Sequence, residues 1–161
     1  MTGLMRYLLI FICSSYLAAC GIHLREANEF GYQHMLISGQ TQITTPLKKT
    51  LARNGVVVSA DAQNADLQVD LLKEENEKRI LSLSGTGKVN EYELYYRIHY
   101  RTKPMSEQLW SKSEIIEARR EFSYSDTDLL AKQDEEKLLV EDMHKEVLGR
   151  LMRRLAALKK P

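Results

Sequence analysis

The sequence predicts an α+β fold: a two-layer sandwich in which a four-stranded, mostly antiparallel sheet carries two helices on one face. The predicted order is β-α-β-β-β-α. Apolar and polar residues alternate in successive segments after residue 66, which is typical of half-buried strands joined by turns. Residues 126–158 repeat apolar side chains at helical spacing. We expect a leader over residues 1–19 and one periplasmic domain over residues 20–161.

The first strand and the first helix have clear boundaries. Residues 32–38 alternate in polarity and end at Gly39. Thr45-Pro46 then opens a helix, with a hydroxyl at the N-cap and a proline whose missing N–H costs nothing in the first turn. Leu47 and Leu51 form its apolar side, and Asn54-Gly55 is a typical helix stop. The short apolar segment 56–58 indicates either a brief strand or a lead-in to the next element.

Three strands follow, joined as an antiparallel meander. The first is residues 67–83, and its apolar side chains share odd numbering: Leu67, Val69, Leu71, Leu81 and Leu83. A turn at Gly85-Thr86-Gly87 leads into the most regular strand, residues 91–101. One of its faces is apolar (Tyr92, Leu94, Tyr96, Ile98 and Tyr100) and the other is mainly charged. The last strand is expected over residues 109–122, with no assignment of its buried face.

The C-terminal helix is expected over residues 126–158. Its apolar stripe consists of Val140, Met143, Val147, Leu151, Leu155 and Leu158. At about 1.5 Å per residue this helix is about 50 Å long, whereas a compact domain of this size is roughly 35–40 Å across. We therefore expect the helix either to bend near Gly149 or to overhang the sheet.

The N-terminus carries the pattern of a bacterial lipoprotein signal. An apolar run over residues 8–17 is too short to span a bilayer. It ends in Leu17-Ala18-Ala19-Cys20, small residues before a cysteine. We expect cleavage before Cys20, with acyl chains on its thiol. The alternative is a plain secretory peptide or an uncleaved anchor with an incidental cysteine.

Composition argues against several classes of function. The net charge is +1, and removal of residues 1–19 brings it to zero, so no bias toward nucleic acid is expected. No Gly-x-Ser-x-Gly motif is present, and no two histidines have metal-ligand spacing within one element. Gly85-Thr86-Gly87-Lys88 lies between strands, whereas a phosphate-binding loop requires a following helix. We therefore predict no catalytic residue, no metal and no cofactor, so the protein is not expected to be an enzyme.

Basic residues follow the regular strand and its ends: Lys88, Arg97, Arg101 and Lys103. Arg97 and Arg101 share one face, and the planar guanidinium group suits phosphate oxygens. One interpretation is therefore a site for a phosphorylated glycolipid. The other is a solvated sheet face with cross-strand ion pairs, because Glu91 and Glu93 lie on the same face.

The start of the mature chain, Cys-Gly-Ile-His-Leu-Arg at residues 20–25, resembles the LptE family of lipopolysaccharide-assembly lipoproteins. Three further segments are similar to the family pattern: Asn54-Gly55-Val56 after the first helix, Glu91-Tyr92 at the regular strand, and Ala131-Lys132 before the apolar helix. The order of elements agrees as well. The resemblance therefore extends over nearly all of the mature chain.

The resemblance implies partners and a location. Family members plug the lumen of the outer-membrane barrel LptD, assist its assembly and bind lipopolysaccharide in transit to the cell surface. Lys132 matches a basic residue implicated in that binding. A second base is expected before the regular strand, where this chain has Gly85-Thr86-Gly87 and the nearest base is Lys88. Gly21 is typical of sorting to the outer membrane, on its periplasmic side. The alternative is a generic periplasmic scaffold lipoprotein that does not bind lipopolysaccharide.

Overall fold

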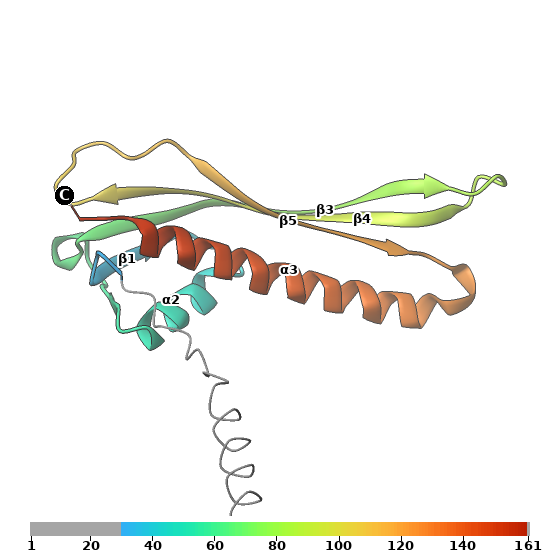
Figure 1. Cartoon of the computed structure of the whole chain (residues 1–161), viewed down its shortest axis with the longest axis horizontal. Coiled ribbons are helices and arrows are strands. Elements are labelled where there is room, and N and C mark those ends of the chain that lie inside the picture. Colours follow the sequence, from blue (N-terminus) through green and yellow to red (C-terminus); the bar gives the residue numbers. More distant parts are fainter. Residues whose placement is uncertain (1–29, 161) are drawn as a thin grey trace, which may run out of the picture.

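A computed structural model describes residues 30–160 of the chain. Five strands form one sheet in the order β2-β1-β3-β4-β5. Their bounds are β1 His34–Ser38, β2 Val57–Val58, β3 Leu67–Leu83, β4 Val89–Pro104 and β5 Glu114–Ser123. Helices α2 (Thr44–Arg53) and α3 (Leu129–Ala157) cover one face of this sheet and leave the other open (Figure 1). The 3₁₀ turns η1 (Ala62–Asn64) and η2 (Asp126–Asp128) lie before β3 and α3. The predicted two-layer α+β fold is confirmed.

The sheet has five strands, whereas the sequence predicted four, because the segment after α2 pairs with β1. Gly55 turns the chain back toward the sheet, and its φ of 82° lies in the left-handed region that favours glycine. The N–H of Val57 then donates to the carbonyl of Gln33 at 2.8 Å, and that of Ser59 to the carbonyl of Met35 at 2.9 Å. Since β1 is parallel to both β2 and β3, the sheet is mixed, with an antiparallel half made by β3, β4 and β5.

The helix neither overhangs the sheet nor needs to bend, because the sheet itself is elongated. β3 has 17 residues and β4 has 16, so at about 3.3 Å per residue each strand exceeds 50 Å. The 29 residues of α3 extend over about 44 Å. Figure 1 shows α3 running along the strands, with the β3–β4 turn projecting beyond its first residue. The expectation of a compact domain was therefore wrong.

The odd-numbered pattern of β3 does not hold along its whole length. The register with β4 shifts between Leu71 and Lys73, and shifts again near Ser82. A β-bulge of this kind reverses which side chains face each side of the strand. Leu81 and Leu83 remain 40% and 56% exposed instead of joining the core, because they lie near the β3–β4 turn, which projects beyond α3 (Figure 1). The first register shift brings the odd-numbered acidic residues Glu75 and Glu77 onto the open face.

The core lies between the antiparallel strands and the helices. α3 contributes the buried residues Met143, Val147, Leu151, Met152 and Leu155, while Val140 and Leu158 lie partly buried at its margins. α2 contributes Leu47 and Leu51. β4 buries the predicted side chains Leu94, Tyr96, Ile98 and Tyr100. β5 starts at Glu114, later than the expected residue 109, because the preceding residues form a loop whose Ser111 N–H donates to the carbonyl of Thr102 at 2.8 Å.

Candidate functional site

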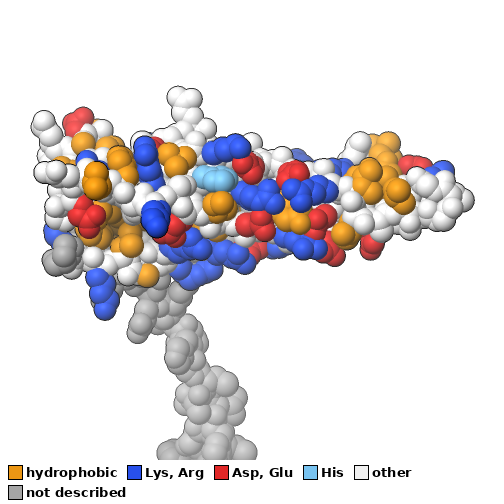
Figure 2. Space-filling model, turned by 90° about the horizontal axis from the view of Figure 1, so that it is seen from above, with side chains coloured by type: hydrophobic (Ala, Val, Ile, Leu, Met, Phe, Trp, Pro, Cys, Tyr) orange, Lys and Arg blue, Asp and Glu red, His pale blue; other side chains and the backbone are white. Residues whose placement is uncertain are grey.

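The open face of the sheet carries a ladder of ion pairs centred on Arg97. Its guanidinium group contacts Glu117 on β5 at very short range, Glu77 on β3 at 3.1 Å and Glu75 at 3.5 Å. Figure 2 shows this face, on which acidic and basic side chains alternate along the middle of the molecule. The hydrogen bond to Glu117, followed by that to Glu77, raises the pKa of Arg97. Its positive charge is therefore already matched by neighbouring carboxylates.

Aromatic side chains extend this ladder in both directions. Tyr95 lies beneath the guanidinium groups of Arg79, Arg97 and Arg119, at 4.7, 4.5 and 5.8 Å from its ring centre. Toward the other end of β4, Arg101 binds Asp70 at 2.8 Å and stacks on Trp110 at 4.4 Å. The face is thus crossed by cation–π contacts as well as by ion pairs.

The ion-pair interpretation of the basic row is what the structure shows, although the acids are not those expected. Glu91 accepts a hydrogen bond from Ser82 at 2.6 Å, and Glu93 pairs with Arg119. The partners of Arg97 and Arg101 come mainly from β3 instead. A bulge in β3 turns Glu75 and Glu77 outward, and the sequence alone could not place that bulge. The interpretation as a lipid-phosphate site stays a prediction.

The two remaining predicted bases reach a common segment at the hairpin end of the molecule. Lys132, on the first turn of α3, donates to Ser123 at 2.9 Å and to Glu135 at 2.8 Å. Lys88, after the β3–β4 turn, lies 3.4 Å from Asp126. Lys88 therefore contacts the connection from β5 to α3, and Lys132 contacts the last residue of β5 just before it. The Lys88 side chain is 73% exposed, whereas that of Lys132 is 20% exposed.

Exposed apolar side chains accompany these bases, and the sequence analysis did not identify them. Ile80, Leu81 and Leu83 lie near the end of β3, and Leu129 and Leu130 lie at the start of α3; Leu130 is 78% exposed. Figure 2 shows apolar side chains gathered toward this end. The available signal in the sequence was that Leu129 and Leu130 precede the apolar stripe that begins at Val140.

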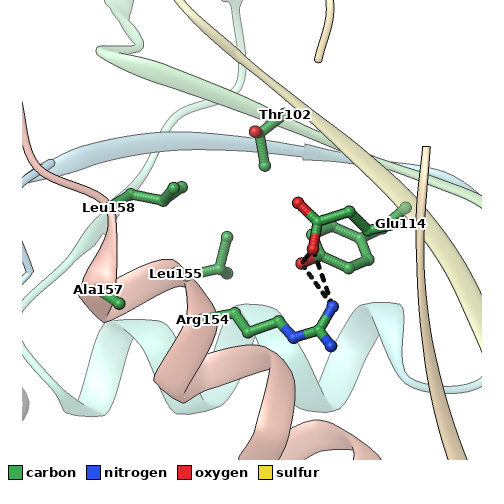
Figure 3. A pocket seen from close by; sticks show the side chains of 7 residues that line it. Thr102, Glu114, Arg154, Leu155, Ala157 and Leu158 are labelled. Atoms are coloured by element: carbon green, nitrogen blue, oxygen red, sulfur yellow. Dashed lines mark hydrogen bonds and ion pairs between the residues drawn. The ribbon is translucent and has the colours of Figure 1, made fainter. Parts of the chain in front are cut away.

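Two hollows are lined by residues of the helices, away from the hairpin end. One of about 270 Å³ lies at the C-terminal end of α3, where Arg154 donates to Glu114 at 2.8 Å and lies 3.4 Å from the Tyr100 hydroxyl (Figure 3). The other, of about 310 Å³, lies between α2 and α3 and is lined by Pro46, His144 and Leu148 among others. Within residues 30–160 no cluster of three potential metal ligands occurs, and no helix is long and apolar enough to cross a membrane.

The comparisons with known proteins agree with this architecture. The family described as "LptE: Lipopolysaccharide-assembly" matches residues 32–155. The chain belongs to the LptE family. Its matched segment runs from just before β1 almost to the end of α3, and therefore includes both helices and every strand of the sheet. The predicted family membership is confirmed.

Solved structures of lipoproteins share the LptE fold. An uncharacterized lipoprotein B from Nitrosomonas europaea has 28% identity and a TM-score of 0.75, with coverage of 85% of this chain and 91% of that chain. The rare lipoprotein B from Shewanella oneidensis has 26% identity and a TM-score of 0.69, with coverage of 77% and 94%. A minor lipoprotein from Acinetobacter baumannii, at 19% identity, TM-score 0.62 and coverage of 78% and 92%, shares the fold alone. No curated protein matches the chain.

Family membership gives the coarse function. The protein is a cell-envelope lipoprotein of a non-enzymatic family with a role in lipopolysaccharide assembly. Of the predicted site residues, the structure brings Lys88 and Lys132 to one end and places Arg97 and Arg101 on the open face. Cys20 and the predicted leader lie outside the described residues.

Proposed function

We propose that this LptE protein is the periplasmic partner of the outer-membrane barrel LptD, assists its assembly, plugs its lumen and binds lipopolysaccharide in transit. The single observation that carries the binding proposal is the composition of the hairpin end. Lys88 and Lys132 lie at this end, which also carries exposed apolar residues such as Ile80 and Leu130. Lipopolysaccharide combines phosphates with acyl chains, so it presents both kinds of group that such a surface binds.

The open face supports the plug proposal. Arg97 and Arg101 are each matched by carboxylates on neighbouring strands, so covering this face leaves few unpaired charges. Removal of an unpaired charge from water is strongly unfavourable, whereas a paired charge with its hydrogen bonds retained is tolerated. A face of this kind is suited to a polar barrel lumen.

Arg97 and Arg101 also remain proposed contacts for lipopolysaccharide, with a condition that the structure imposes. A phosphate could bind Arg97 only by displacing Glu117 or Glu77, and could bind Arg101 only in competition with Asp70. Lys88 has a single acidic neighbour at 3.4 Å and is largely exposed. We therefore assign a main contact to Lys88. Lys132 is assigned the second because it matches the basic residue of the family pattern, and a phosphate there competes with Glu135.

Attachment to the membrane is proposed through acyl chains on Cys20, with the domain on the periplasmic side of the outer membrane. A single acyl chain anchors a protein only marginally, whereas two or more hold it stably. The sequence pattern at residues 17–20 and the lipoprotein neighbours support this attachment.

Charge reversal at Lys132 tests the lipopolysaccharide site. Lys132→Glu replaces attraction by repulsion next to Glu135, and a charge-assisted hydrogen bond contributes roughly 1.5–3 kcal/mol. We expect the affinity for lipopolysaccharide to fall about tenfold or more, and Lys88→Glu to act in the same direction. Glu135→Gln, which removes the competing carboxylate, should strengthen binding. Lys137→Glu makes the same charge change at an exposed position of the same helix and serves as the control.

Isothermal titration of the chain from residue 20 onward with lipopolysaccharide gives these affinities. Equal binding by Lys132→Glu and the parent would contradict the site. Purification of the tagged lipoprotein from membranes in mild detergent tests the plug separately. We expect LptD in stoichiometric amount. Recovery without LptD, together with absence of lipopolysaccharide binding, would favour the generic scaffold.

A further inference from the structure

The helix layer is electrically asymmetric along its length, although the whole chain carries a net charge of only +1. Residues 126–142, at the hairpin end, contain seven acidic and two basic side chains. Residues 143–160, at the other end, contain six basic side chains and one acidic. α2 adds Lys48, Lys49 and Arg53 and has no acid. The charges are thus separated between the two ends of one layer.

The bases of α2 and α3 lie at the same end of the molecule. α2 packs beside the middle and C-terminal half of α3, with Pro46 opposite His144 and Leu148 across one hollow. Figure 1 shows α2 beneath the end of the sheet at which α3 terminates. The two helices therefore add their charges to one surface.

Most of these bases are not neutralised by neighbours. Arg150, Arg154 and Lys160 pair with Glu146, Glu114 and Asp66, the second of these pairs being drawn in Figure 3. Among residues 30–160, six exposed bases of the helix layer at this end form no ion pair, and we name them the basic end: Lys48, Lys49, Arg53, Lys145, Arg153 and Lys159. They differ in this respect from Arg97 and Arg101 on the open face.

The chain enters the fold at this same end. Gly31 lies so close to the end of α3 that a Cβ there would be 2.6 Å from the carbonyl oxygen of Leu158. The Tyr32 hydroxyl donates to the carbonyl of Lys159 at 3.3 Å. Residues 20–29 separate the predicted acylation site from this point, and a fully extended chain of that length reaches at most about 40 Å. The basic end is therefore the part of the fold to which the segment carrying the predicted anchor is joined.

We propose that the basic end binds the anionic phospholipid headgroups of the leaflet that holds the acyl chains, and that the hairpin end consequently points away from these headgroups and into the barrel lumen. The proposal rests on the lipid attachment at Cys20 for its geometry. Charge complementarity selects the occupant, because clustered lysines and arginines beside a membrane anchor favour anionic lipid. Favourable interaction with the helix dipole accounts for basic residues in the last turn of a helix. It does not account for Lys48 and Lys49, which lie in the middle of α2.

Vesicle sedimentation tests this orientation without barrel or lipopolysaccharide. The protein is the chain from residue 20 onward with Cys20→Ser, so that no acyl chain contributes. Vesicles contain either one-third phosphatidylglycerol in phosphatidylcholine or phosphatidylcholine alone. The test variant is Lys48→Gln/Lys49→Gln/Arg53→Gln. The control, Lys73→Gln/Arg79→Gln/Lys137→Gln, removes the same charge from exposed positions outside the basic end.

We expect the protein to bind the vesicles that contain phosphatidylglycerol and not those of phosphatidylcholine alone. This binding should be lost at high salt, because salt screens the charges. Each basic residue near an anionic surface contributes about a fivefold factor in affinity. The test variant should therefore bind roughly 100-fold more weakly, and the control should bind nearly as well as the parent. Equal losses in both variants, binding to neutral vesicles, or no binding would overturn the proposal. None of these results bears on Lys132 or on recovery of LptD.

Discussion

Truncation of Leu151 tests the packing of α3 on the sheet, on which the positions of both ends depend. Leu151 is fully buried within the cluster that joins α3 to the antiparallel strands. Buried Leu→Ala substitutions cost about 2–5 kcal/mol because they remove apolar contact and leave a cavity. The same cluster contains Met35, Met143 and Met152, whose flexible side chains can fill part of that cavity. We therefore expect a loss of about 2–3 kcal/mol.

Thermal unfolding followed by circular dichroism measures the effect on the chain from residue 20 onward. For a domain of this size, 1 kcal/mol lowers Tm by roughly 2–4 °C, so Leu151→Ala should melt about 5–10 °C below the parent. Leu138→Ala is the matched control, since that leucine is on the same helix and 65% exposed. Its effect should stay within about 0.5 kcal/mol. Equal melting temperatures for the two variants would refute the packing of the stripe on the sheet.

Two further predictions concern the anchor and the pH dependence of stability. Cys20→Ser should abolish incorporation of a fatty-acid probe in cells, and a labelled mutant would contradict the lipoprotein signal. Burial of His144 lowers its pKa below the ordinary 6.5, against smaller opposing effects of Glu74 and Glu141. The unfolded chain therefore binds a proton at His144 at a higher pH than the folded chain does. The free energy of unfolding should consequently fall as the pH drops below about 6.5. Urea unfolding from pH 7 to 5 should show a smaller decline for His144→Phe, and identical slopes would exclude this origin.

Periodicity predicted the elements that bury one face against the core. The alternation over residues 91–101 identified the inward side chains Leu94, Tyr96, Ile98 and Tyr100, all of which are buried. The stripe on α3 was equally clear, because a long amphipathic helix repeats its apolar positions many times. β2 was predicted only as one of two alternatives, a brief strand or a lead-in, because it has only two residues and its pairing depends on the turn at Gly55.

The candidate site was less predictable, since it depends on register. The bulge between Leu71 and Lys73 turns Glu75 and Glu77 toward Arg97, and nothing in the local pattern indicates it. The sequence therefore identified the arginines but assigned them the wrong acidic partners. The resemblance to the family, rather than any periodicity, singled out Lys132.

The open face, the hairpin end and the basic end differ in how many of their charges are paired within the chain. Each is therefore suited to a different kind of partner. On the open face Arg97 and Arg101 are satisfied within the chain, so contact with a barrel wall need not supply their counter-charges. At the hairpin end Lys132 lies within the acidic first half of α3. These carboxylates would repel phosphates that did not reach the lysine directly. At the basic end, unpaired bases favour anionic headgroups. An acidic end next to the membrane would be repelled by those headgroups. The same charge pattern thus favours an orientation in which the tethered end faces the phospholipid headgroups and the lipopolysaccharide-binding end enters the barrel lumen.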